Sequence, residues 1–184
     1  MTAFAHRISC RLAGLAADRR GVSAVEFALL LPIMVTLYLG SVEVSTGIAI
    51  DRKVTLTAHA LADISSQYTT ITNSDMSNIL NASSDIIAPY AVNRLQAVVS
   101  ELAINNSGVA SVVWSDTLNG TARPVGQIVT IPTALAVANS YLILGEVQYS
   151  YDPTFGYVLT NTLTLKDQIY MRPRQSNSVA RTAS

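Results

Sequence analysis

A long uncharged, apolar run near the N-terminus constrains this chain more than any other feature. No residue from Phe27 to Val42 carries a charge. With its tolerable flanks, the run reaches the roughly 20 residues that an α-helix needs to cross a bilayer. The first 20 residues carry four arginines and one aspartate, and a basic flank of this kind stays on the cytoplasmic side. We therefore predict one membrane span, with the rest of the chain facing outward.

The composition leaves room for one domain beyond the span. Without a leader and a span, the chain of 184 residues keeps roughly 130, enough for one modest core. Basic and acidic residues number 12 each, so no overall charge favours binding to nucleic acid. The only cysteine, Cys10, lies before the span. The outer domain is therefore expected to be stabilised by packing alone, without a disulfide.

Helical spacing continues beyond the span. Apolar residues between Ile50 and Gln67 recur at the period of an α-helix, which predicts that the span and the first helix of the ectodomain are continuous. Ser74 is expected to cap a second, shorter helix that runs through Ile87 and ends before Pro89.

Four β-rich runs follow the predicted helices. Leu95 to Ile104 and Val109 to Trp114 flank an Asn-Asn-Ser-Gly turn, which predicts a hairpin. Tyr141 to Asp152 alternates apolar or aromatic residues with polar ones, and Thr160 to Met171 is expected to pair antiparallel with it. Residues 121–133 have the proline and glycine content of a loop. We predict an α+β fold: a long N-terminal transmembrane helix that continues into an ectodomain with a short second helix and an antiparallel sheet of about four strands.

A glycine and a glutamate stand in a fixed order before the apolar run. Gly21 follows a basic pair, and Glu26 and Phe27 come five and six positions later. A general secretory signal is cut after its apolar region, near small residues. The order found here instead resembles the class III (type IV) prepilin site, which a membrane aspartyl peptidase cuts after the glycine.

Two short motifs near the C-terminus agree with this resemblance. Residues 149–155 read Y-S-Y-D-P-T-F, and residues 170–174 read Y-M-R-P-R. Together with Gly21, Glu26 and Phe27, they are similar to the TadE/TadG-like family of tight-adherence (Tad) pilus proteins. The match brackets most of the chain, although the middle carries no assignable motif.

The resemblance implies a cut between Gly21 and Val22, after which the mature protein keeps its anchor. The implied segments are a basic prepilin leader (1–21), a transmembrane helix (22–44), an α+β, pilin-like ectodomain (45–174) and a disordered tail (175–184).

The family also implies roles for individual residues. In related pilins, the glutamate equivalent to Glu26 is thought to neutralise the N-terminus of a neighbouring subunit, and Phe27 belongs to the same processing and pairing motif. Arg172 and Arg174 are expected to contact another pilus component, although a solvent-exposed pair at the end of a strand is an equally good interpretation.

As a minor pilin or pseudopilin, the protein would act in pilus assembly and surface adhesion. The implied partners are the prepilin peptidase, the major and other minor pilins, the inner-membrane assembly platform and the lipid bilayer, with no nucleic acid. The implied location is the bacterial inner membrane, with a cytoplasmic N-terminus, a periplasmic ectodomain and possible incorporation into the surface pilus.

Several conspicuous residues have ordinary interpretations. Glu43, about 26 Å from Glu26 along a helix, is expected to emerge at the outer membrane interface, and contact with a partner span is the alternative. The alternating tyrosines Tyr141, Tyr149 and Tyr151 are expected in the core rather than in an adhesive strip. Trp114 is interpreted in the same way.

No catalytic or metal-binding pattern is found. His6 lies in the predicted leader, and His59 is expected to be a structural residue on a helix, so no triad can form. Phosphate loops, metal-ligand spacings and calcium-loop patterns are also absent from the sequence, so we predict a non-enzyme without a cofactor. The alternative function is an extracytoplasmic binding domain with an uncleaved anchor, or with a general signal removed near residues 45–49.

Overall fold

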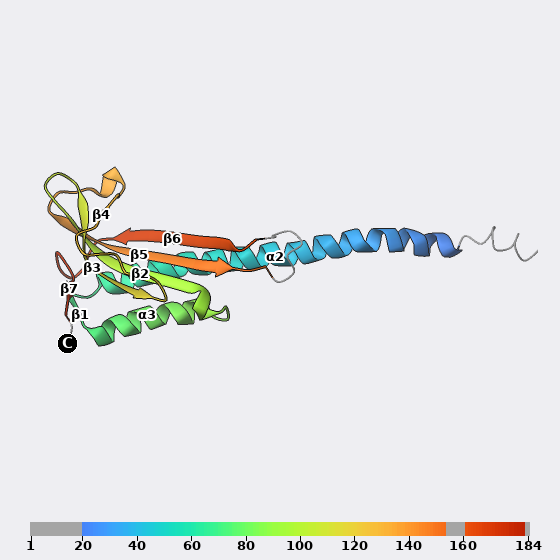
Figure 1. Cartoon of the computed structure of the whole chain (residues 1–184), viewed down its shortest axis with the longest axis horizontal. Helices are drawn as coiled ribbons and strands as arrows, with labels where there is room; N and C mark the ends of the chain where they lie inside the picture. Colours follow the sequence, from blue (N-terminus) through green and yellow to red (C-terminus); the bar gives the residue numbers. More distant parts are fainter. Residues whose placement is uncertain (1–19, 154–160, 183–184) are drawn as a thin grey trace, which may run out of the picture.

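One helix runs from the exposed end of the molecule through its folded head (Figure 1). The computed structural model describes residues 20–153 and 161–182. Helix α2 spans Arg20–Ser66, 47 residues, and passes through Pro32 without a break. Its first half contacts no other described element, whereas its second half lies along strands β5 and β6. The predicted continuity of span and ectodomain helix is confirmed.

The buried stripe of α2 explains why this helix packs on a sheet. Ile50, Val54, Ala58 and Leu61 follow one another at three- and four-residue spacing, and each is at most 1% exposed. They form a single apolar face that covers the inner side of the sheet.

The sheet has five strands in the order β4-β3-β2-β5-β6, and every pairing is antiparallel. The strands are β2 (Leu95–Ile104), β3 (Ala110–Leu118), β4 (Ile128–Val129), β5 (Ser140–Tyr151) and β6 (Leu163–Met171). Both predicted hairpins, β2–β3 and β5–β6, are confirmed. Strand β4 lies within the segment that was expected to form a loop, and with two residues it is too short for a periodic signal. Short 3-10 turns are found at Val92–Arg94 and Thr133–Leu135.

Helix α3 (Asn73–Ile87) packs against α2 and is held at both ends. Its N-cap is Thr72 rather than the predicted Ser74. Thr72 and Asp75 form a capping box, in which each side chain accepts a hydrogen bond from the other's backbone N–H. The Thr72 hydroxyl also donates to Asp75 Oδ2 at 2.6 Å, and this hydrogen bond, together with the one from the Thr72 backbone N–H, holds the pKa of Asp75 below its ordinary value. At the other end, Lys53 Nζ donates to the carbonyls of Ile86 and Ala88, both at 2.7 Å.

The C-terminal segment folds back onto the head, so the prediction of a disordered tail is wrong for the described residues 175–182. Strand β7 (Ala180–Arg181) pairs in parallel with β1 (Thr70–Ile71), which connects the two helices. Val179 has no exposed surface and belongs to the main core. The burial of this single residue has no periodic pattern, which is why the sequence did not indicate it.

Buried polar side chains secure this tail. Glu101, 1% exposed, accepts a hydrogen bond from the Val179 backbone N–H at 2.6 Å, and Trp114 Nε1 donates to the Val179 carbonyl at 2.7 Å. Arg181 forms a bidentate ion pair with Asp116. The tail therefore joins strands β2 and β3 to strand β1, the connection between the two helices.

Substitution of Gly145 is expected to disrupt the contact between helix and sheet. A Cβ at Gly145 would lie 2.8 Å from the Ala58 carbonyl oxygen and 3.2 Å from the Ala62 Cβ. We expect Gly145→Ala to lower the free energy of unfolding of the solubilised full-length chain by about 1–3 kcal/mol in urea titrations. Gly47→Ala is the matched control, because its nearest neighbour is 3.6 Å away and alanine favours a helix. Equal stability of both variants would contradict the close contact at Gly145.

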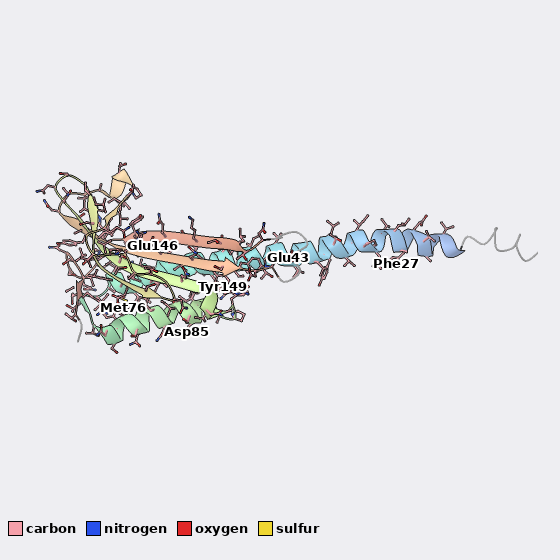
Figure 2. All side chains as sticks on the ribbon, viewed as in Figure 1. Phe27, Glu43, Met76, Asp85, Glu146 and Tyr149 are labelled. Carbon is pink, nitrogen blue, oxygen red and sulfur yellow. The ribbon has the colours of Figure 1, made fainter. Side chains whose placement is uncertain are left out.

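Removal of the Glu101 carboxylate is expected to release the tail. Glu101→Leu leaves the Val179 N–H without its acceptor, and an unsatisfied buried donor costs about 1–3 kcal/mol. Fluorescence of Trp114, the only tryptophan, would report both unfolding and tail release. The exposed Asp85→Asn is the matched control (Figure 2). Unchanged stability and unchanged Trp114 fluorescence in Glu101→Leu would contradict the role of Glu101.

The same carboxyl group should make stability depend on pH. Burial raises the pKa of Glu101, although the Val179 N–H and Trp114 oppose the shift. Because the unfolded chain then ionises first, stability falls as the pH rises from the ordinary glutamate pKa through the raised one. Glu101→Gln keeps an acceptor and should lose this part of the pH dependence in unfolding measured between pH 4 and pH 8. An identical pH profile in Glu101→Gln would exclude the titration of Glu101 as its cause.

Candidate functional site

The N-terminal half of α2 presents a large apolar surface that no described part of the chain covers. Every residue from Gly21 to Tyr38 is exposed, and Phe27 projects freely from the helix (Figure 2). The exposed aliphatic and aromatic side chains here are Val22, Val25, Phe27, Leu29, Leu30, Leu31, Ile33, Met34, Val35, Leu37 and Tyr38. A surface of this size on a soluble monomer would be unusual, and it indicates contact with a membrane or with other proteins.

The polar groups in this half suit an apolar environment. Thr36 donates its hydroxyl hydrogen to the Pro32 carbonyl at 2.8 Å, and Ser41 donates to the Tyr38 carbonyl at 2.8 Å. Hydroxyls satisfied within their own helix cost little in hydrocarbon. By length and composition, this is the one helix among the described residues that could cross a membrane.

Glu26 is the only charged side chain between Gly21 and Val42. It is exposed and lies four residues after Val22, so the two residues share one face of the helix. A Cβ added at Gly21 would have no neighbour within 4 Å, so packing within the described chain does not require this glycine. The predicted processing residues thus lie together on bare helix, far from the head.

Glu43 lies where the bare helix enters the head, and it is buried there, which the sequence did not predict. It is 2% exposed. Tyr151, at the end of β5, covers this turn of the helix and donates its hydroxyl hydrogen to the Glu43 carbonyl at 3.2 Å. Burial raises the pKa of Tyr151, and the negative charge of Glu43 adds to the shift. The sequence shows Glu43 at the end of an apolar run but does not show that a distant strand ends over it.

The tyrosine and tryptophan predictions are largely confirmed. Tyr149, Tyr151 and Trp114 are 3%, 5% and 7% exposed and belong to the main core. Tyr141 is only partly buried. His59 is exposed on α2, and no group of His, Cys, Asp or Glu side chains among the described residues is arranged to hold a metal.

The two arginines of the C-terminal motif occupy different environments. Arg174 forms an ion pair with Asp63, and its backbone N–H donates to the Ser66 carbonyl at 2.8 Å, so it fastens the end of β6 to the end of α2. Arg172 is exposed. Contact of either arginine with a partner stays a prediction. The first C-terminal motif lies partly outside the described residues, which stop at Pro153 and resume at Asn161.

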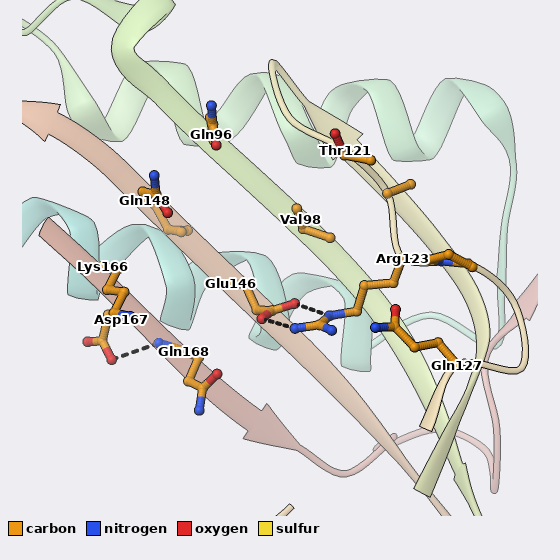
Figure 3. A pocket seen from close by; sticks show the side chains of 13 residues that line it. Gln96, Val98, Thr121, Arg123, Gln127, Glu146, Gln148, Lys166, Asp167 and Gln168 are labelled. Carbon is orange, nitrogen blue, oxygen red and sulfur yellow. Dashed lines mark hydrogen bonds and ion pairs between the residues drawn. The ribbon is translucent and has the colours of Figure 1, made fainter. Parts of the chain in front are cut away.

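A second candidate site, which sequence reasoning missed, is an open groove of about 690 Å³ on the outer face of the sheet (Figure 3). Strands β2, β5 and β6 form its floor, and the loop after β3 forms one wall. Arg123 on this loop makes a bidentate ion pair with Glu146 of β5, with both N···O distances at 2.6 Å. The alternation of β5 predicted that Glu146 turns outward, but no local signal connected it to Arg123.

The bare apolar helix and the α+β head together fit a single-pass membrane protein. Residues 21–63 match the family model described as TadE-like protein, which confirms the resemblance found in the sequence. The match begins at Gly21 and covers the bare half of α2 and most of its packed half. No curated protein and no solved structure matches the chain.

The matched segment is the one that the geometry singles out. The match supports a pilin-like protein of the kind associated with Tad pili. The sheet, α3 and the groove lie outside the match.

Proposed function

We propose that this protein is a minor pilin or pseudopilin of a Tad-type (type IVc) pilus that acts in pilus assembly and surface adhesion. The observation that carries the proposal is that the family match, residues 21–63, covers the whole exposed apolar segment of α2 and starts at Gly21, the glycine of the predicted cleavage site. A prepilin peptidase cuts between Gly21 and Val22, and the mature chain begins with the span.

Assembly would use the same surface twice. In the inner membrane, the side chains from Val22 to Val42 contact lipid, with the N-terminus cytoplasmic and the head periplasmic. On extraction by the assembly platform into a pilus, the spans of the major and other minor pilins replace the lipid. Because both surroundings are apolar, the exchange costs little hydrophobic energy, and close packing determines the preferred partner.

In the proposed pilus, the carboxylate of Glu26 aligns neighbouring subunits by pairing with a charge on the next subunit. After cleavage, each subunit carries a new ammonium at Val22. Two opposite charges about 4 Å apart attract by roughly 4 kcal/mol at an effective dielectric of about 20. An exposed carboxylate beside an apolar surface is costly in isolation, and the ammonium of a neighbouring subunit offsets that cost.

The rival function is an anchored extracytoplasmic binding domain. The structure disfavours a general signal cut near residues 45–49, because α2 is continuous there and Glu43 and Gly47 are buried in the head. Such a cut would remove the buried turn of α2 that Tyr151 covers. An uncleaved anchor is compatible with the fold and is the alternative that an experiment must exclude.

The N-terminus of the mature protein distinguishes these functions. We expect mass spectrometry of the terminal peptide, from protein purified from its native membrane, to begin at Val22. Gly21→Leu should leave the leader attached, whereas Ser23→Ala should be processed normally. A native start at Met1 would exclude prepilin processing.

Substitution of Glu26 tests the pairing role separately. We expect Glu26→Ala and Glu26→Gln to reduce incorporation into purified pili at least tenfold, because neither side chain can neutralise the ammonium. Incorporation is measured by immunoblot of sheared pili against the membrane fraction, and Ser23→Ala is the matched control on the same bare segment. Normal processing and normal incorporation of both Glu26 variants would exclude the pairing role.

A further inference from the structure

The floor of the groove on the outer face of the sheet is formed by side chains from three neighbouring strands. Gln96 of β2 lies opposite Gln148 of β5, and Gln148 lies opposite Lys166 of β6. The next row along the strands carries Val98, Glu146 and Gln168. These side chains stand side by side on one face of the sheet, as Figure 3 shows.

The wall of the groove is held in position before any ligand binds. Arg123 Nε and Nη2 both donate to the Glu146 carboxylate, and the Arg123 backbone N–H donates to Ser115 Oγ at 3.0 Å. Further along the loop, the Gly126 N–H donates to the Val112 carbonyl at 2.8 Å. A wall fixed in this way reduces the entropy lost on binding.

The polar side chains of the groove are available to a ligand. Among the described residues, the amides of Gln96, Gln127, Gln148 and Gln168 and the ammonium of Lys166 make no hydrogen bond with another side chain or with the backbone. Each amide offers two donors and an acceptor with two lone pairs, so one side chain can both donate to and accept from neighbouring hydroxyls.

Most charges that line the groove are already paired within the protein. Arg123 and Glu146 neutralise each other, and the hydrogen bonds with Glu146 raise the pKa of Arg123. Asp167, the residue next to Lys166, also borders the groove, and its Oδ2 accepts a hydrogen bond from the Thr55 hydroxyl of α2 at 2.6 Å. Lys166 remains as one exposed ammonium at the rim, which can donate to a hydroxyl.

We propose that this groove binds a neutral saccharide chain, whose hydroxyls pair with the row of amides on β2 and β5. Val98 on the floor and Pro124 on the wall give apolar contacts for the C–H faces of the sugar rings. The groove lies within the head, so the proposal does not depend on cleavage at Gly21 or on assembly through the span. It assigns a ligand class to the head rather than to the helix.

Binding of defined oligosaccharides to the full-length protein tests the proposal. The protein is placed in lipid nanodiscs, because detergents with sugar headgroups would compete. The probes are cellohexaose, maltohexaose, chitohexaose and the acidic hexagalacturonate, followed by saturation-transfer difference NMR. We expect at least one neutral hexasaccharide to bind, and we expect binding to be at least tenfold weaker in the double variant Gln96→Met/Gln148→Met, which keeps side-chain length but removes both amides.

Two further variants make the result specific. Gln175→Met removes an exposed amide outside the groove and should leave binding unchanged, and Ala122→Trp should block the groove from its wall without touching the core. Trp114 fluorescence in Gln96→Met/Gln148→Met verifies that the head is folded. The proposal is overturned if no neutral hexasaccharide binds, if only hexagalacturonate binds in a Lys166-dependent manner, or if the groove variants abolish self-association of the protein but no sugar binding is found.

Discussion

The close approach of helix α2 to strand β5 is the contact on which the rest of the head depends. Gly145 has no side chain, and Ala58 and Ala62 have small ones, so the helix backbone comes within reach of the strand backbone. Tight packing at this point brings Ile50 and Val54 onto the inner face of the sheet, where both are buried. The same helix continues beyond the head without contacts to other described elements. The exposed apolar surface and the head are therefore connected by one continuous helix.

The C-terminal tail completes what this contact begins. Without it, the connection between α2 and α3 would have only a two-residue strand and no sheet partner. Val179 fills the core beside Trp114, and the buried Glu101 satisfies its backbone N–H. A charged group with so little exposure is costly, and its hydrogen bonds offset that cost. The chain end is thereby incorporated into the core although it contributes few apolar residues.

Regular patterns could be predicted from the sequence, and isolated contacts could not. The long helix, both hairpins and the inward-facing Tyr149 and Tyr151 follow from periodicity, which each stretch of chain carries by itself. The burial of Glu43 could not be predicted because it depends on Tyr151, which is distant in the sequence. The ordered C-terminal tail was not predicted because a single buried valine, Val179, produces no periodic pattern in the sequence. The residues proposed for processing were indicated by resemblance alone. The groove depends on the loop whose Arg123 pairs with Glu146 of strand β5, and no local signal in the sequence shows this.

The uninterrupted path of α2 from Gly21 into the head has a mechanical consequence. Each residue of an α-helix turns the chain by about 100° and advances it by about 1.5 Å. Insertion or deletion of one residue between Glu26 and Glu43 would therefore rotate the whole head about the helix axis, because no flexible joint absorbs the change. In an assembly held together through the bare segment, the length of that segment therefore sets the rotation of each head about its helix axis. It also decides whether the groove on the sheet faces outward.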